Sequence, residues 1–181
     1  MKKLEYAMFP DVEMWVREFR SGVAFDYEKA VEIIKKQLEK DPEPRRKEAW
    51  RKLMKKYKEK IETDTRKAKM ICCECVERLI KYLSLLFPKL EIYYARIAKQ
   101  PDYPWNHAVV CVINPQTKKF CFVQTIDGEE TDENIISPRT IKEWETKRWW
   151  TYIESEKNRY EIKIEGEKVF LNVYPKAANE L

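Results

Sequence analysis

Three groups of residues in the sequence have side chains that could do chemistry together. They are the cluster Cys72-Cys73-Glu74-Cys75, the single histidine His107, and Asp127. A thiol becomes an effective nucleophile when an imidazole can take its proton and a carboxylate orients that imidazole. A cysteine at the start of a helix is also a better thiolate, because the helix dipole stabilises negative charge there. The three groups therefore predict a nucleophilic Cys-His-Asp site.

The cysteine cluster lies at the start of an expected helix, from about Met70 to Phe87, which Pro88 ends. Cys72 lies about 20° from the centre of the apolar face of this helix, whereas Cys73 and Cys75 lie about 80° away. Cys72 is therefore the expected nucleophile, and its backbone amide would be one oxyanion donor. Cys73 stays open as the alternative.

The histidine and the aspartate lie on two consecutive expected strands, 107–113 and 120–126, which a turn beginning at Pro115 joins. If Ile113 pairs with Cys121, His107 lies opposite Asp127. Their Cβ atoms would then be about 5 Å apart, which suits a hydrogen bond. A register shift by one residue would place the two side chains on opposite faces.

These motifs resemble the transglutaminase-like branch of the papain-like cysteine hydrolases. Ile71-Cys72-Cys73-Glu74-Cys75-Val76 is similar to the family's cysteine helix, and later buried positions hold leucines. Asn106-His107-Ala108-Val109-Val110 is similar to its histidine strand, and Val123-Gln124-Thr125-Ile126-Asp127 to its aspartate strand. The resemblance extends over about residues 70–128, with Met70 where the family often has a glycine.

The resemblance implies a hydrolase or acyltransferase that acts on amide bonds of peptides or proteins. Cys72 would attack the carbonyl group, His107 would transfer the proton, and Asp127 would orient the imidazole. Trp105 and Asn106 directly precede the histidine and are the candidates for contacting the substrate. Such chemistry requires no metal or organic cofactor.

Other interpretations of the same residues stay open. Cysteine is among the most buried residue types, so the cluster could serve only for packing. Cys72, Cys75, His107 and Cys111 could together form a tetrahedral zinc site. Asp127 precedes Gly128, and this pair is also common in turns.

The elements that must position these residues change type along the chain. Helices are expected at 26–40, 45–61 and 70–87, after a first part, 1–25, that shows no clear period. Strands are then expected at 92–98, 107–113, 120–126, 149–154, 160–165 and 168–174, with a short helix at 138–147 that Ser137 would cap. This order predicts an α+β fold in which N-terminal helices precede an antiparallel sheet packed on the cysteine-bearing helix, as in papain-like and transglutaminase-like proteins.

Composition limits the remaining possibilities. The chain has 181 residues, so we expect a single domain over 1–181, with a helical part at 1–69 and a catalytic-like core at 70–181. No apolar run approaches the length of about 18 residues that a membrane helix needs, and the few cysteines do not form an even secreted framework. We therefore expect a cytoplasmic protein with no membrane segment, whereas the peptide or protein substrate is what the resemblance implies.

The segment 35–69 is strongly basic, with 15 Lys or Arg against 7 Asp or Glu. Its most regular part, the expected helix 45–61, also has one apolar stripe, which is typical of a solvated helix packed on a core. The alternative function is a binding module without enzymatic activity, either an inactive transglutaminase-like fold or a small zinc domain. Such a module would dock on an anionic partner through segment 35–69.

Overall fold

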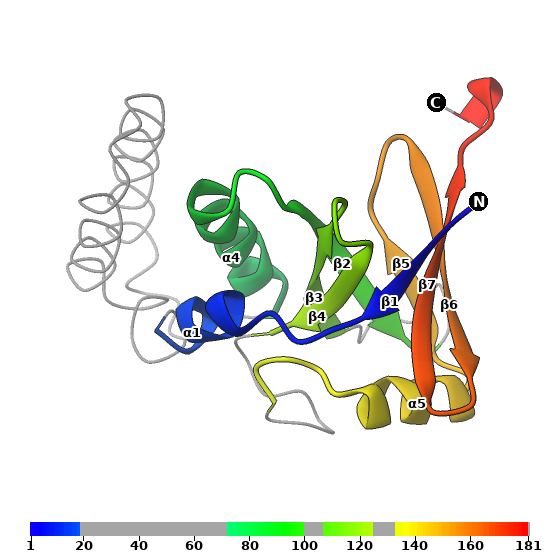
Figure 1. The fold of residues 1–181 in the computed structure, drawn as a ribbon, viewed down its shortest axis with the longest axis horizontal. Helices are drawn as coiled ribbons and strands as arrows, with labels where there is room; N and C mark the ends of the chain where they lie inside the picture. Colours follow the sequence, from blue (N-terminus) through cyan, green and yellow to red (C-terminus); the bar gives the residue numbers. More distant parts are fainter. Residues whose placement is uncertain (19–71, 100–106, 125–132, 181) are drawn as a thin grey trace.

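The computed structural model describes residues 1–18, 72–99, 107–124 and 133–180 (Figure 1). Its helices are α1 (Pro10–Glu18), α4 (Cys72–Leu86), α5 (Pro138–Thr146) and a short 3-10 helix, Ala178–Glu180. Its strands are β1 (Lys2–Tyr6), β2 (Glu91–Ala98), β3 (His107–Asn114), β4 (Lys119–Val123), β5 (Trp150–Ile153), β6 (Asn158–Glu165) and β7 (Lys168–Pro175). The expected helices 26–40 and 45–61, and the basic segment 35–69, lie outside the described residues.

The strands form one sheet in the order β5-β2-β3-β4-β1-β7-β6. All neighbouring pairs are antiparallel except β1 and β4, which run parallel. The two strands at the ends of this order, β5 and β6, also contact each other, so the sheet curves into a nearly closed, barrel-like shape. Helix α5 lies across one end of the strands, below them in Figure 1.

The expected fold, N-terminal helices followed by a sheet on the cysteine-bearing helix, is wrong. The chain begins with a strand, and β1 is inserted between β4 and β7 near the middle of the sheet. The structure is therefore mostly β, and the expectation of a helical part at 1–69 is wrong for Lys2–Tyr6. The sequence gives only a weak sign of this strand, because its apolar alternation is limited to Leu4 and Tyr6 and only Leu4 is fully buried.

Two hydrophobic cores lie on the two faces of this sheet. The interior core is enclosed by the curved sheet and α5, and it contains residues from every strand, among them Leu4, Val109, Phe122 and Leu171. The exterior core lies between the outer face of β2–β4 and helices α1 and α4. Helix α4 buries Val76, Leu79, Leu83 and Leu86 there, which confirms the face that its apolar spacing predicted.

Alternation along β3 decides which side chains face which core. Ala108, Val110 and Val112 belong to the exterior core, beneath α4, whereas Val109, Cys111 and Ile113 belong to the interior core. Both faces of β3 are thus buried, which explains why its sequence is continuously apolar. Among the described residues, no helix is long and apolar enough to cross a membrane.

Candidate functional site

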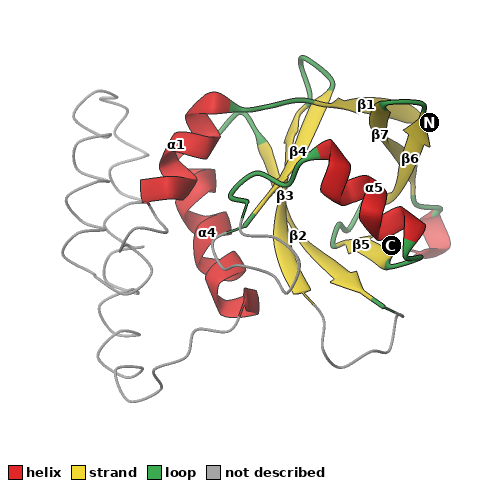
Figure 2. Ribbon diagram, turned by 90° about the horizontal axis from the view of Figure 1, so that it is seen from below, coloured by secondary structure: helices red, strands yellow, loops and turns green. Residues whose placement is uncertain are grey.

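The first turn of α4 and the first residue of β3 lie at the same end of the sheet. Helix α4 passes into β2 through the short segment 87–90, and β2 pairs antiparallel with β3. Helix α4 and β3 therefore run in the same direction, and Cys72 and His107 are their respective first residues. Figures 1 and 2 show this arrangement from two sides. The side chains of residues 72–75, including Cys72 and Cys73, lie outside the described part.

Alternate residues of a strand share one face, and His107 is in phase with Val109 and Cys111. Its side chain therefore starts from the interior face of the sheet. Helix α4 covers the opposite, exterior face of the same strand. Because His107 is the first residue of β3, a group from α4 can meet its imidazole only around the end of the strand. The described residues thus bring these two elements to one end, but from different faces.

The register that would place His107 opposite Asp127 is wrong. Ile113 pairs with Phe120, and Val112 pairs with Cys121. The cause is the turn between β3 and β4, in which Lys118 adopts a positive φ of 55° and the Asn114 side chain accepts hydrogen bonds from the backbone amides of Gln116 and Thr117. This turn is one residue tighter than expected. Asp127, Trp105 and Asn106 themselves lie outside the described residues.

One hydrogen-bond partner of His107 in the described part of the chain is Gln124, a residue that the sequence analysis did not identify. The distance between His107 Nε2 and Gln124 Oε1 is 2.6 Å. Gln124 directly follows β4 on the interior face, after Phe120 and Phe122, and its side chain is only 1% exposed. A glutamine in phase with two buried phenylalanines is a signal that the sequence does contain, because a buried polar side chain needs hydrogen-bond partners.

A second hydrogen bond fixes how the Gln124 amide is turned. Gln124 Nε2 donates to the backbone carbonyl oxygen of Glu133 at 2.8 Å. A carbonyl oxygen can only accept, so the amide NH2 group must face Glu133 and the amide oxygen must face His107. The imidazole Nε2 therefore donates its proton to Gln124, and Nδ1 is the basic nitrogen of the neutral ring.

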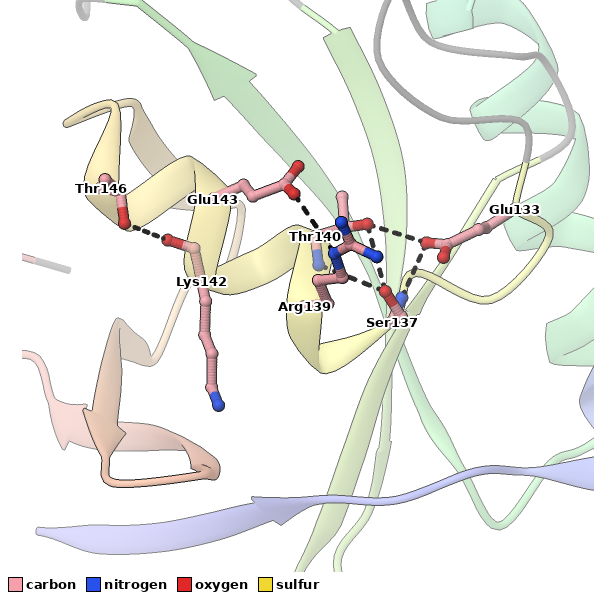
Figure 3. A network of polar contacts seen from close by, with 7 residues as sticks. All are labelled: Glu133, Ser137, Arg139, Thr140, Lys142, Glu143 and Thr146. Atoms are coloured by element: carbon pink, nitrogen blue, oxygen red, sulfur yellow. Dashed lines mark hydrogen bonds and ion pairs between the residues drawn. The ribbon is translucent and has the colours of Figure 1, made fainter.

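Glu133 is itself held in place at the start of α5 (Figure 3). Its carboxylate accepts hydrogen bonds from the Ser137 amide at 2.9 Å and from Thr140 Oγ1 at 3.0 Å. Ser137 caps α5, accepting from the Thr140 amide at 3.2 Å, as the sequence predicted. The orientation of His107 thus depends on a chain of contacts that begins at a helix cap.

The residues proposed as a zinc site are divided between the two faces of the sheet. Cys111 is fully buried on the interior face, whereas α4, which contains Cys72 and Cys75, lies outside it. Burial raises the pKa of the Cys111 thiol far above its ordinary value, as expected for a thiol packed in an apolar core. Within the described ranges, no three His, Cys, Asp or Glu side chains are grouped to hold a metal ion.

A cleft of about 430 Å³ lies at the opposite end of α4 from Cys72. It is lined mainly by the beginning of α1 and the segment after α4, including Phe9, Val12, Phe87 and Leu90. This cleft is therefore separate from the His107 site.

Comparisons with known proteins give no relative. No family model matches the chain, and no curated protein and no solved structure is significantly similar to it. The resemblance to transglutaminase-like hydrolases therefore remains an expectation from short motifs.

Proposed function

We propose that this protein is a cysteine-dependent hydrolase or acyltransferase that acts on amide bonds of peptides. Cys72 is the nucleophile, with Cys73 as the alternative, and His107 is the base. The hydrogen-bonded chain from His107 through Gln124 to the Glu133 carbonyl is the observation that supports this function most directly. It gives the single histidine of the protein a defined orientation at the end of the sheet where α4 begins.

Gln124 takes the orienting role that the sequence analysis gave to Asp127. An amide oxygen accepts from Nε2–H in both the neutral and the protonated imidazole, so this contact persists while Nδ1 gains and loses a proton. An amide in this position is known in Cys-His-Asn sites, where the imidazole is oriented without a carboxylate. The fixed ring can therefore act as a base first and as an acid later in the same reaction.

The proposed reaction has two steps. His107 takes the thiol proton, and the sulfur forms a bond with the substrate carbonyl carbon while the carbon–nitrogen bond breaks. The leaving amine takes the proton from His107, and a thioester remains. Water, or an acceptor amine in acyl transfer, then attacks the thioester through the same base and regenerates the thiol. Trp105 and Asn106 remain the proposed substrate contacts.

Thiol reactivity tests this proposal on the full chain without a known substrate. The probe is iodoacetamide at pH 6, and the labelled positions are mapped by peptide mass. A helix-terminal thiol paired with His107 reacts quickly at this pH because part of it is thiolate. Cys111 and Cys121 serve as internal controls, since burial raises both of their pKa values.

We expect fast labelling at Cys72 or Cys73, and at least a ten-fold slower reaction in His107→Ala. Gln124→Leu should slow labelling at the same position, whereas Gln116→Leu, on the exposed turn, should leave the labelling rate unchanged. Equally slow labelling of every cysteine in the folded protein, with no effect of His107→Ala, would overturn the proposal in favour of simple packing.

A further inference from the structure

Two aromatic rings form an accessible surface on the outer face of β5. Trp150 and Tyr152 point to the same side of the strand, and their rings stack with centroids 5.2 Å apart and planes 5° apart. Tyr152 is 38% exposed, and Trp150 is partly buried. Helix α4 covers β2 and β3, so β5 lies at the edge of the covered area. An accessible flat pair of rings can bind another apolar or planar group.

Arg96 lies beside these rings on the neighbouring strand. It pairs directly with Tyr152, and Ala98 pairs with Trp150, so all these side chains share the outer face. The other neighbour of Arg96 in the sheet is Ala108, which is also small. No hydrogen bond or ion pair engages the Arg96 guanidinium in the part of the chain that the structure describes. A half-buried guanidinium among small and aromatic side chains binds a carboxylate strongly.

This surface lies at the same end of the sheet as the proposed catalytic residues. Arg96 is two residues before the end of β2, and the residue after it, Ile97, pairs with His107. The guanidinium and the rings belong to directly opposed residues, whose Cβ atoms lie about 5 Å apart in such a pair. The charged group and an aromatic ring on such neighbouring positions can be reached by a single amino acid that carries both a carboxylate and a ring.

We propose that Arg96, Trp150 and Tyr152 form a subsite for a C-terminal aromatic residue of a peptide. Arg96 binds the terminal carboxylate, and the stacked rings contact the aromatic side chain. This inference rests on the proposed function: the subsite lies on the outer face and His107 starts from the interior face, so the last amide bond of such a peptide would meet the imidazole around the end of β2 and β3. The leaving amine is then the aromatic amino acid itself.

Binding of a product-like compound tests the subsite without any catalysis. N-acetylphenylalanine, which has the carboxylate, and its neutral amide are titrated into the full chain, and binding is followed by NMR. We expect the acid to bind at least ten-fold more tightly than the amide. Arg96→Gln should remove this preference, and Trp150→Ala should weaken both compounds. Arg139→Gln, an exposed arginine on α5, is the matched control and should change neither.

Equal affinity for the acid and the amide, or an unchanged preference in Arg96→Gln, would overturn the subsite. If Arg96→Gln lowers the melting temperature strongly, Arg96→Lys is used in its place. The preference for the acid over the amide should then fall to an intermediate value, because the charge remains and the planar fork is lost. If the acid does not bind, the result of the thiol labelling still stands. If the labelling is slow, the result of the binding experiment still stands. The two proposals can therefore fail separately.

Discussion

At the scale of single residues, the Gln124 side chain determines which ring nitrogen of His107 carries the proton. Its amide group lies between an acceptor that cannot donate, the Glu133 carbonyl, and the imidazole of His107. The proton of the neutral ring must therefore be on Nε2. Because His107 is the only histidine in the protein, every imidazole signal in a spectrum belongs to this site.

We predict that long-range 1H–15N correlation spectra above neutral pH show the Nε2–H tautomer of His107. Gln124→Leu should remove this preference, because the ring loses its acceptor, whereas Gln116→Leu should not. The Gln124 variant should also lower the free energy of unfolding by about 1–3 kcal/mol, since it leaves a buried carbonyl without its donor. A wild-type spectrum dominated by the Nδ1–H tautomer would contradict the assigned orientation.

The limits of sequence analysis at this scale come from one turn. The sequence correctly places His107 at the start of a strand and predicts a turn at Pro115. It does not reveal that Lys118 adopts a positive φ, because lysine has no particular preference for this conformation. That single residue shifts the register by one, so that Ile113 pairs with Phe120 instead of Cys121.

At the scale of elements, the start of α5 links helix stability to the site. Ser137 caps the helix, and Glu133 binds both Ser137 and Thr140. Ser137→Ala should therefore lower the free energy of unfolding by about 1 kcal/mol. Arg139→Ala, which removes an exposed ion pair on the same helix, should change it by much less. Urea denaturation measures both, and equal effects would argue against the cap.

Strand β1 contains a tyrosine, Tyr6, that should make the stability of the protein depend on alkaline pH. Burial, aided by the negative groups nearby, raises the pKa of Tyr6 from 10.0 to about 12. The unfolded chain thus loses this proton at lower pH than the folded protein does, so the stabilisation is complete below pH 10 and is lost as the pH rises towards 12. Tyr6→Phe keeps the edge-on contact with Phe120 and removes the titration.

The urea midpoint of Tyr6→Phe should accordingly fall less between pH 9 and pH 11 than the wild-type midpoint. Tyr174→Phe, on the same sheet, is the control and should follow the wild type. Parallel losses in wild type and Tyr6→Phe would show that Tyr6 does not contribute to the pH dependence.

Most elements, apart from β1, could be predicted because their apolar residues repeat at the right period. The helix expected at 138–147 is α5, the one at 70–87 is α4, and the six strands after α4 in the described ranges lie where they were expected, within a few residues at each end. Strand β1 was not predicted because only Leu4 of its residues is buried, while Lys3 and Glu5 form ion pairs on the outer surface. A strand stabilised by its neighbours leaves little trace in its own sequence.

At the scale of the whole molecule, Leu4 connects the two halves of the sheet. Strand β1 pairs with β4 on one side and with β7 on the other, and Leu4 is its contribution to the interior core. Leu4→Ala should lower the free energy of unfolding by about 2–5 kcal/mol. Leu90→Ala, in the segment after α4 and only partly buried, should cost clearly less. Chemical denaturation followed by circular dichroism compares them, and equal costs would contradict this role of β1.

The overall fold could not be predicted because it depends on pairing between distant segments. Sequence periodicity reports local structure, and the order of helices followed by strands suggested two separate layers. The sheet instead places the first strand between β4 and β7, which no local pattern specifies.

The position of β1 also determines when the protein can finish folding during its synthesis. Lys2 leaves the ribosome long before its partner in the sheet, Val173, has been made. Until β7 has been made, β1 can pair only with β4, and its other edge stays open to pairing with other chains. The nascent chain thus exposes an incomplete sheet until β7 has been made, so a chaperone that covers this edge should raise the yield of folded protein.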